Sequence, residues 1–381
     1  MKKTALFIHD HIFYKIDDAY YSNGGLPKEI WLRYLKYFDN IIVIGRQGNI
    51  PNKSMVLSSQ ENVEFKLIKN SLINNERKKT IVNEINNVSH IIVRLPSRLG
   101  LIALRHARGK KILIEVVGCA FEALWYHGSI LGKLYAPIMY LQTKRAVKNS
   151  QSTIYVTQKF LQDRYPSSCN VTIAACSNVE ISKTSEDILK NRELKILNSS
   201  QEEINIGIVA SLNSKYKGLN TLFKSIKEII KQEKNVRLHI VGGGNTEKWE
   251  ALAKNLNIRK NVSFEGILNN KEAMFRWMDK LDIYIQPSLT EGLPRALIEA
   301  MSRGLPAIAS NVGGIPELLK DDYLIEPKNS NDLSFKISRF LSNRDLLLSA
   351  AKENFKTAEK YEKSKIDQRR DVVIANFSKD F

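Results

Sequence analysis

The sequence has little cysteine and no long run of apolar residues. Its 381 residues include three cysteines, Cys119, Cys169 and Cys176, without the paired spacing of a structural zinc site. This composition fits a reduced cytosolic setting and predicts no disulfide framework. No apolar run approaches the roughly 18 residues that span a bilayer. The first residues, MKKTALFIHDHIF, have too short an apolar run for a signal peptide and predict a first strand.

Acidic residues are scarce relative to basic ones. Lysine and arginine number 58 against 40 aspartates and glutamates, so the formal net charge is +18. Such an excess suits nucleic acid, an anionic membrane surface or phosphorylated ligands. A biased genome would also raise the charge without any function. Because the sequence lacks helix-turn-helix, zinc-finger and RNP-type aromatic motifs, we expect no nucleic-acid partner.

The length and the pattern of apolar segments indicate two domains of α/β type. With 43% hydrophobic residues the chain can bury large cores, and it is too long for one typical domain. Strand-like segments alternate with helical ones in both halves, which predicts doubly wound parallel sheets. The first strand is expected over residues 4–9, followed by a loop. The polar stretch 178–201 is expected to be the interdomain linker.

The densest pattern lies in residues 282–317, DIYIQPSLTEGLPRALIEAMSRGLPAIASNVGGIPE. It predicts a strand at Asp282–Gln286, a polar turn, a helix over Arg295–Arg303 with Pro294 at its first position, and a second strand. Glu291 lies in the turn and Glu299 in the helix. Free N–H groups at a helix N-terminus suit a diphosphate, whereas carboxylates suit hydroxyls. Phosphate, ribose and a sugar ring together form the implied ligand.

Each carboxylate alone has an ordinary explanation, as a charge near a helix dipole or a solvated helix residue. The complete string, however, resembles the E-x7-E signature of retaining family 4 glycosyltransferases, as EGLPRALIEA followed by GLPAIAS and GGIPE. The resemblance implies the GT-B fold, two Rossmann-like doubly wound domains facing a central cleft. Residues 1–185 would bind the acceptor and residues 186–357 the nucleotide sugar. A C-terminal helix within residues 358–381 would cross back to the first domain.

The resemblance also implies roles for individual residues. Glu299 would bind ribose hydroxyls, Glu291 would hold hydroxyls of the donor sugar, and Lys217 would stabilise the departing diphosphate. The further contacts to the donor sugar and diphosphate would come from Gly24, Gly25, Lys215, Gly292, Leu293 and Arg295. The main chain of Gly266, Ile267 and Leu268 would hold the nucleotide base. GT-B enzymes lack the DxD metal site, so we expect no metal and no cofactor beyond the donor substrate.

The sequence departs from the family pattern at two places. Ser211 stands where the family has an arginine, which leaves Lys215 as a substitute cation. Gly118 and Cys119 stand where many members have a histidine after a strand, and His127 is the nearby candidate to replace it. These departures keep a catalytically inactive scaffold open as an alternative.

Residues 124–148, LWYHGSILGKLYAPIMYLQTKRAVK, mix aromatic with basic side chains. One interpretation is a helix pair with core aromatics. The other is a segment that lies on an anionic membrane surface.

These observations predict a retaining, metal-independent hexosyltransferase that uses a nucleotide sugar of the UDP or GDP type. The expected acceptor is a glycan or a polyprenyl-diphosphate-linked glycan, in the synthesis of a bacterial capsule, exopolysaccharide or O-antigen. The expected location is cytoplasmic, with a peripheral position on the inner face of the plasma membrane. The alternatives are an inactive GT-B scaffold and a basic protein that binds nucleic acid or membranes. An epimerase or phosphorylase of the same fold fits less well, because the E-x7-E spacing and the lack of an assignable pyridoxal-phosphate lysine argue against them.

Overall fold

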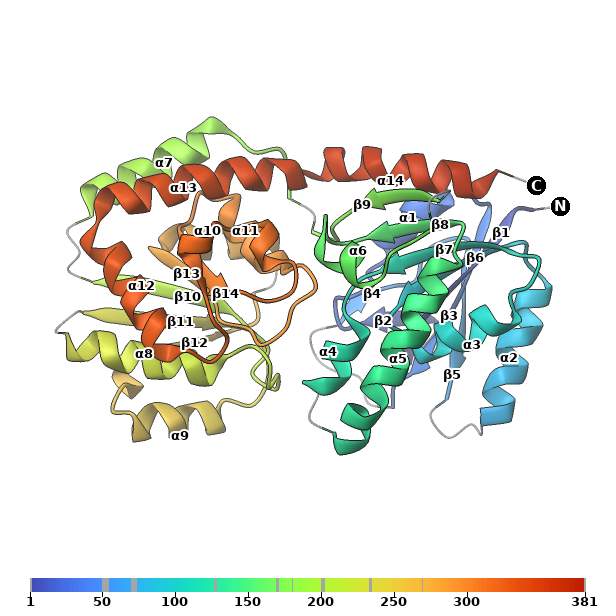
Figure 1. The fold of residues 1–381 in the computed structure, drawn as a ribbon, viewed down its shortest axis with the longest axis horizontal. Helices are drawn as coiled ribbons and strands as arrows, with labels where there is room; N and C mark the ends of the chain where they lie inside the picture. The colour runs from blue at the N-terminus through green and yellow to red at the C-terminus, as the bar shows by residue number, and fades with distance from the viewer. Residues whose placement is uncertain are drawn as a thin grey trace. The chain divides into compact units, whose positions relative to one another are not determined.

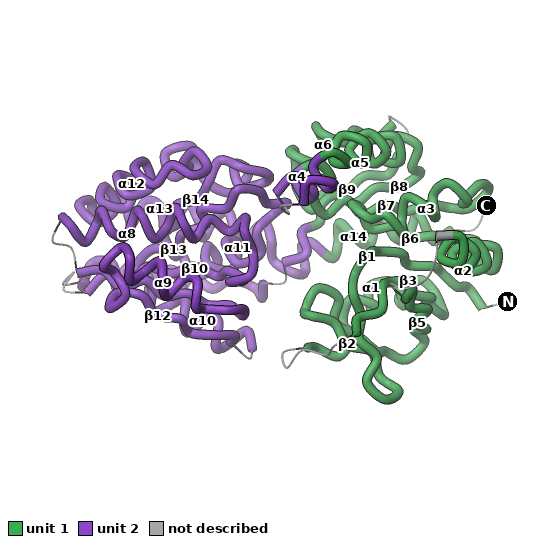
Figure 2. The backbone as a smooth tube through the Cα atoms, turned by 90° about the horizontal axis from the view of Figure 1, so that it is seen from below, with its two compact units in different colours: residues 1–121, 134–176, 367–381 green, residues 122–133, 177–366 purple. Residues whose placement is uncertain are grey.

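The computed structural model describes residues 2–49, 55–69, 74–126, 129–168, 171–179, 181–199, 203–232, 235–268 and 270–379. The chain divides into two compact units (Figure 2). Unit 1 comprises Met1–Phe121, Leu134–Cys176 and Asp367–Phe381, and unit 2 comprises Glu122–Lys133 and Ser177–Ile366. Each unit is built on a sheet of parallel strands (Figure 1).

The parallel strands of unit 1 follow the order β5-β3-β1-β6-β7-β8-β9. Their central members are rich in buried apolar residues because helices cover a parallel sheet on both faces. The strands are β1 (Thr4–Ile16), β3 (Asn40–Gln47), β5 (Val63–Ile68), β6 (His90–Leu95), β7 (Lys111–Val116), β8 (Ser152–Tyr155) and β9 (Thr172–Ala175). The helices of this unit are α1 (Glu29–Leu35), α2 (Asn74–Asn86), α3 (Arg98–His106), α6 (Phe160–Arg164) and most of α14 (Lys363–Ser378). Two more helices, α4 (Ala120–Trp125) and α5 (Ile130–Lys148), contain the points where the chain passes between the units.

The expected loop after residue 9 is wrong. β1 continues to Ile16, and β2 (Ala19–Ser22) turns back to pair with it antiparallel, with Phe13 opposite Ser22. The turn is made by two aspartates, and Asp17 adopts a φ of 51°. Aspartate tolerates this left-handed conformation, which two-residue hairpin turns require. A short strand, β4 (Val56–Leu57), pairs with β2.

Unit 2 contains six parallel strands in the order β12-β11-β10-β13-β14-β15. In chain order this is 3-2-1-4-5-6, the Rossmann arrangement, whose ligands bind beyond the carboxyl ends of the strands. The strands are β10 (Ile204–Val209), β11 (Val236–Val241), β12 (Val262–Gly266), β13 (Ile283–Gln286), β14 (Ala307–Ser310) and β15 (Leu324–Ile325). The helices are α7 (Glu186–Asn198), α8 (Leu219–Lys231), α9 (Glu247–Asn255), α10 (Lys271–Lys280), α11 (Arg295–Met301), α12 (Ser330–Ser342) and α13 (Arg344–Ala358). In Figure 1, α7 and α13 lie on one side of this sheet and α8 on the other.

The expected linker at 178–201 is wrong over most of its length, because it contains α7. Arg192 of this helix is buried and donates hydrogen bonds to the carbonyl oxygens of Leu281 and Met278, at 2.5 and 3.0 Å. Burial lowers the pKa of its guanidinium to about 10. An arginine on the inner face of the helix breaks the apolar periodicity that marks a packed helix in a sequence. The segment therefore has the sequence pattern of a linker although it packs as a helix.

Among the described helices, none is both long and apolar enough to cross a bilayer.

Candidate active site

Glu291 lies at the centre of a hydrogen-bond cluster beyond the carboxyl end of β13. Its Oε1 accepts hydrogen bonds from Lys217 Nζ at 2.7 Å, Gln286 Nε2 at 2.9 Å and Ser288 Oγ at 2.7 Å. The Lys217 and Glu291 side chains are only 19% and 10% exposed, so solvent screens this ion pair less than a surface pair. Within the described part of the chain, Oε2 of Glu291 has no hydrogen-bond partner. One carboxylate oxygen is therefore fixed while the other can accept from a ligand.

A buried polar relay, which the sequence did not predict, orients Glu291. The Tyr284 hydroxyl donates to Gln286 Oε1 at 2.9 Å, and the Gln286 amide donates to Ser288 Oγ and to Glu291. All three relay residues are at most 1% exposed, and burial raises the pKa of Tyr284 above its ordinary value. Tyr284, Gln286 and Ser288 alternate along the chain, so they share one face as β13 ends. This alternation of polar side chains at the end of a buried strand was the available signal.

Lys217 is positioned by the loop between β10 and α8. Gly218 caps α8 with a φ of 72°, and a Cβ there would lie 1.7 Å from the carbonyl oxygen of Pro287. The amide of Leu289 donates to the carbonyl oxygen of Tyr216 at 2.7 Å. Only glycine allows this close backbone approach, which sets the Lys217 ammonium beside Glu291. The Lys-Gly pair is thus explained by packing against residues 287–289.

The loop after β14 supports the Glu291 turn from another direction. Gly313 has a φ of 58°, and a Cβ there would lie 1.9 Å from the carbonyl oxygen of Glu291. The amide of Gly314 donates to the carbonyl oxygen of Gly292 at 2.8 Å. Three segments that are distant in the sequence therefore converge on Glu291. The Gly-Gly pair of GGIPE acts as their backbone support.

Glu299 lies on α11, and its carboxylate is half-buried. Burial raises the pKa of this carboxyl above its ordinary value, although the positive charges of Arg295 and Lys271 oppose the change. Within the described residues its side chain makes no hydrogen bond. Arg295 is the exposed first residue of α11, Leu293 is buried and Gly292 is half-buried. Glu299 therefore has its full acceptor capacity available.

The helix itself differs from the expectation at both ends. It ends at Met301 instead of Arg303, and Pro294 is the N-cap residue instead of the first helical residue. With a ψ of 111°, Pro294 is extended, so the polar turn continues to the start of α11.

The segment expected to hold the base follows the edge strand β12. Gly266 ends this strand with a φ of 72°, and its carbonyl oxygen accepts from the amide of Gly242 at 2.7 Å. Ile267 is exposed and Leu268 half-buried. Their position beyond the carboxyl end of β12 is where a Rossmann sheet binds ligands.

Lys215 lines a pocket of about 230 Å³ in unit 2 together with Lys224, Lys328 and Trp249. The lining also includes Gly218 and Leu289, which adjoin Lys217 and the Glu291 turn, but neither Lys217 nor Glu291 itself. Among the described residues, no hydrogen bond or ion pair joins Lys215 to the Glu291 cluster.

Gly24 and Gly25 belong to unit 1 and precede α1. Gly24 has a φ of 83°, and a Cβ at Gly25 would lie 2.8 Å from Cε1 of His11. A ring nitrogen of His11 is hydrogen-bonded to Ser22 Oγ at 2.7 Å, and the same hydroxyl accepts from the amide of Leu26 at 3.1 Å. This network holds the glycine loop against the middle of β1.

Two residues bear on the missing family histidine, namely His127 and Cys119. His127 lies outside the described residues. Cys119 is buried, and its Sγ lies 3.5 Å from the Tyr165 hydroxyl. It therefore packs inside unit 1.

Two further polar groups in unit 1 have structural roles. Asp10 accepts the amides of Arg98 and Leu99 at 2.6 and 3.0 Å, and so caps the start of α3. Glu115 is buried in an ion pair with Arg94 at 2.7 Å. Although burial opposes it, Arg94 holds the pKa of this carboxyl at about 2.

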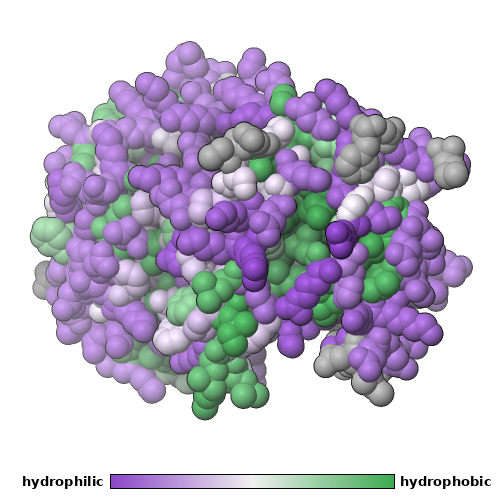
Figure 3. All heavy atoms as spheres, turned by 45° about the vertical axis from the view of Figure 1, so that its right-hand side comes forward, coloured by the Kyte–Doolittle hydropathy of each residue, from purple (hydrophilic) through white to green (hydrophobic). Residues whose placement is uncertain are grey.

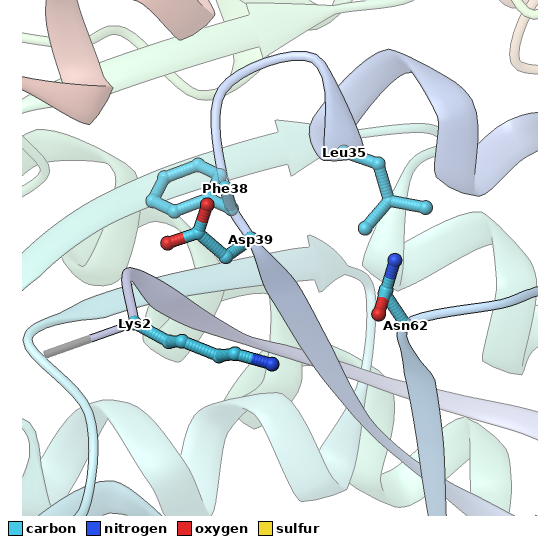
Figure 4. A pocket seen from close by; sticks show the side chains of 5 residues that line it. All are labelled: Lys2, Leu35, Phe38, Asp39 and Asn62. Atoms are coloured by element: carbon cyan, nitrogen blue, oxygen red, sulfur yellow. The ribbon is translucent and has the colours of Figure 1, made fainter.

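One large pocket of unit 1 lies away from the ligand-binding edge. Figure 4 shows Lys2, Leu35, Phe38, Asp39 and Asn62 around a volume of about 710 Å³. Its residues precede or start strands, so it lies at the amino ends of β1 and β3, whereas parallel sheets bind ligands at the carboxyl ends. The Asp39 carboxylate already accepts from the amide of Lys3 at 2.7 Å. This pocket carries no functional assignment.

Comparison with known proteins identifies the family. A model of the family described as "Glycosyl transferases group 1" matches residues 190–358. Protein CapJ of Staphylococcus aureus is 37% identical over 386 residues, which cover 98% of this chain and 95% of CapJ. The chain belongs to the glycosyl transferases group 1 family. It is therefore a glycosyltransferase, as the E-x7-E string predicted.

Other known proteins share part of the sequence or the whole fold. The O-antigen biosynthesis glycosyltransferase WbnH of Escherichia coli is 30% identical over 118 residues, 31% of this chain and 33% of WbnH. HepE of Anabaena, solved in complex with UDP-glucose, has a TM-score of 0.67 at 17% identity, with coverage of 98% of this chain and 99% of HepE. The predicted GT-B fold, with two Rossmann-like domains, is confirmed.

Proposed function

We propose that this glycosyltransferase moves a hexosyl-type sugar from a UDP- or GDP-type nucleotide sugar to a glycan or polyprenyl-diphosphate-linked acceptor, with retention of configuration and without a metal. The observation that carries the proposal is the Glu291 cluster. It presents a fixed carboxylate, a half-buried lysine and, on the next helix, the unpartnered carboxylate of Glu299. A nucleotide-diphosphate sugar needs those three groups for its sugar hydroxyls, diphosphate and ribose.

In this proposal each group meets one part of the donor. Oε2 of Glu291 accepts hydrogen bonds from hydroxyls of the donor sugar. The Lys217 ammonium has three donor hydrogens and gives one to Glu291, so it retains hydrogens for a diphosphate oxygen. Glu299 accepts from the ribose hydroxyls, and the main chain of residues 266–268 contacts the base. The amides of Gly292, Leu293 and Arg295 add donors for the diphosphate.

The same geometry argues against Glu291 as a covalent nucleophile. Three donors, one of them a cation, already neutralise its Oε1 and fix the side chain. Hydrogen bonds of this kind occupy electron pairs that a nucleophile would use to attack carbon. We therefore propose same-face substitution. The bond from C1 to the diphosphate oxygen breaks, the acceptor oxygen bonds to C1 on that face, and the acceptor proton passes to the leaving diphosphate. Lys217 stabilises the charge that develops there.

The setting we propose is bacterial surface polysaccharide synthesis on the cytoplasmic side of the membrane. One relative supports it through its name alone, because WbnH is an O-antigen biosynthesis glycosyltransferase. The similarity to CapJ extends over nearly the full length of both chains.

A thermal-shift panel tests the donor proposal. UDP, GDP, ADP and CMP are added singly, each with and without EDTA. We expect one nucleotide to stabilise the protein by about 2.7 kcal/mol at a hundredfold excess over its Kd, and the effect to survive EDTA. Stabilisation that EDTA removes would contradict metal independence. Binding without any sugar transfer would favour the inactive scaffold.

A further inference from the structure

Helix α5 turns its bulkier apolar side chains outward. The exposed side chains lie three or four positions apart and so share one helix face: Leu131 is 77% exposed, Leu134 70%, Ile138 49% and Leu141 63%. The buried face holds residues that are on average smaller or more polar, namely Ala136, Met139, Thr143 and Val147. An ordinary surface helix has the opposite pattern, with its larger apolar residues toward the core. The outward face of α5 is therefore built to meet an apolar partner.

This exposure is concentrated in one place. Of the fifteen large hydrophobic residues exposed in the described part of the chain, six belong to α4 and α5: Trp125, Ile130, Leu131, Leu134, Ile138 and Leu141. We call these six the apolar stripe. Figure 3 shows apolar side chains gathered in a column that projects at the lower edge of the face it draws. Single exposed hydrophobics are normal on a surface, whereas a contiguous group marks an interaction site.

On α5, the charges beside the apolar stripe are all positive. The spacing that runs through Leu141 continues with Arg145 and Lys148, and Lys144 adjoins them. All three cations are exposed or half-exposed. Near the other end, Lys133 Nζ lies 5.6 Å from the centre of the Trp125 ring. The sequence of α5 contains no aspartate or glutamate. An apolar surface bordered only by cations complements anionic lipid head groups above an acyl layer.

We propose that the apolar stripe lies in the interface of an anionic lipid bilayer, with Lys133, Lys144, Arg145 and Lys148 against the head groups. The helix axis then lies along the membrane plane, because the opposite face of α5 is buried in the protein and no described helix is long and apolar enough to cross a bilayer. Trp125 has the amphipathic ring that favours the head-group level. The proposal does not depend on the proposed reaction.

Vesicle co-sedimentation of the full chain tests the proposal. The vesicles contain phosphatidylcholine alone or with phosphatidylglycerol. The apolar variant is Leu134→Ser/Ile138→Ser/Leu141→Ser, and the charge variant is Lys144→Gln/Arg145→Gln/Lys148→Gln. A matched control, Leu194→Ser/Leu197→Ser, removes two exposed leucines of α7, which are 55% and 48% exposed. Circular dichroism and the Tm establish that each variant is folded.

The wild type and the matched control should bind the anionic vesicles, and both stripe variants should bind at least about tenfold more weakly. Raising the salt to about 0.5 M should weaken wild-type binding, because it screens the head-group contacts. Brominated lipids should quench the fluorescence of the wild type more than that of Trp125→Phe. Equal vesicle binding by the apolar variant and the wild type would overturn the proposal. So would a wild-type dimer, seen by light scattering, that the apolar variant abolishes, because a second copy would then cover the stripe.

Nucleotide thermal shifts of the apolar variant separate this proposal from the proposed reaction. The variant should retain the nucleotide response of the wild type. A protein that binds anionic vesicles but no nucleotide would contradict the proposed reaction without contradicting the membrane proposal.

Discussion

At the scale of single residues, the Lys217–Glu291 pair determines how the site must be tested. Replacing Glu291 with alanine would leave a half-buried ammonium without its partner, so a change in diphosphate binding would mix two effects. Glutamine keeps the shape of the side chain and one acceptor oxygen. It removes only the charge and the second acceptor.

Glu291→Gln should therefore lower kcat by about 100-fold, because the amide nitrogen that replaces Oε2 cannot accept hydrogen bonds from the sugar hydroxyls. The affinity for the nucleoside diphosphate should stay within about threefold, since Lys217 remains in place. Steady-state transfer rates and calorimetric titration measure the two quantities. Full activity in this variant would show that Glu291 has no part in the transfer.

Glu299→Ala should act on nucleotide binding instead. Losing hydrogen bonds from the ribose to a carboxylate should cost about 1–3 kcal/mol of binding free energy. Glu272→Ala is a matched control, because Glu272 is an exposed carboxylate on the neighbouring α10. Calorimetry with the preferred nucleoside diphosphate measures both variants. Equal affinities for wild type and Glu299→Ala would remove Glu299 from the ribose site.

The sequence predicted Glu291, Glu299 and Lys217 as site residues through their place in a family string. It did not predict that Lys217 and Glu291 form an ion pair, because 74 positions separate them and only the close approach at Gly218 joins them. Gln286 and Ser288 escaped notice because a glutamine and a serine at a strand end have no chemistry of their own. Their role appears only when the hydrogen bonds are known.

At the scale of elements, two glycines hold the loops of the site together. Gly218 and Gly313 both have positive φ, and a Cβ at either would collide with a backbone carbonyl. A side chain at these positions forces the loops apart as well as straining the turn. At a glycine that has positive φ but open space around it, a substitution would add the backbone strain alone.

Gly313→Ala should therefore destabilise the protein by more than the roughly 1–2 kcal/mol cost of a left-handed alanine, and should abolish transfer. Gly109→Ala is the control, because Gly109 has a φ of 75° with nothing within 4 Å of its Cβ position. Thermal unfolding and transfer rates compare the two. Equal losses of stability would mean that the contact with Glu291 does not matter.

The sequence predicted helices and strands correctly where burial on one or both faces gave a simple pattern of apolar residues. The central strands are rich in apolar residues, as a parallel sheet covered on both faces requires. The β1–β2 hairpin and α7 were missed, the first because its turn uses two aspartates instead of Asn-Gly, and the second because a buried arginine interrupts its inner face. Helix α5 left two interpretations open, since only the structure shows which of its faces is buried.

At the scale of the whole molecule, two half-buried histidines in unit 1 predict an acid-sensitive fold. Burial lowers the pKa of His9 to about 3, with the charge of Arg94 acting in the same direction. Burial also lowers the pKa of His11 to about 3, with His9 as a further cause. In the unfolded chain both titrate near 6.5. The unfolded state therefore binds more protons than the folded state between these values.

Stability should consequently be full above pH 6.5 and fall as the pH is lowered toward 3, by at most about 1.4 kcal/mol per pH unit for each histidine. Denaturant titrations from pH 7.5 to about 5 measure the slope. His11→Asn should reduce this slope by about half. A free energy of unfolding that stays constant over this range would show that neither histidine resists protonation in the folded protein.

The central claim is that the Glu291 cluster performs retaining transfer without a metal. Proton NMR of the product formed from an α-linked nucleotide sugar, in the presence of EDTA, tests it most directly. We expect an α-linked product from the wild type and a rate about 100-fold lower from Glu291→Gln. A β-linked product, or a reaction that EDTA stops, would contradict the account.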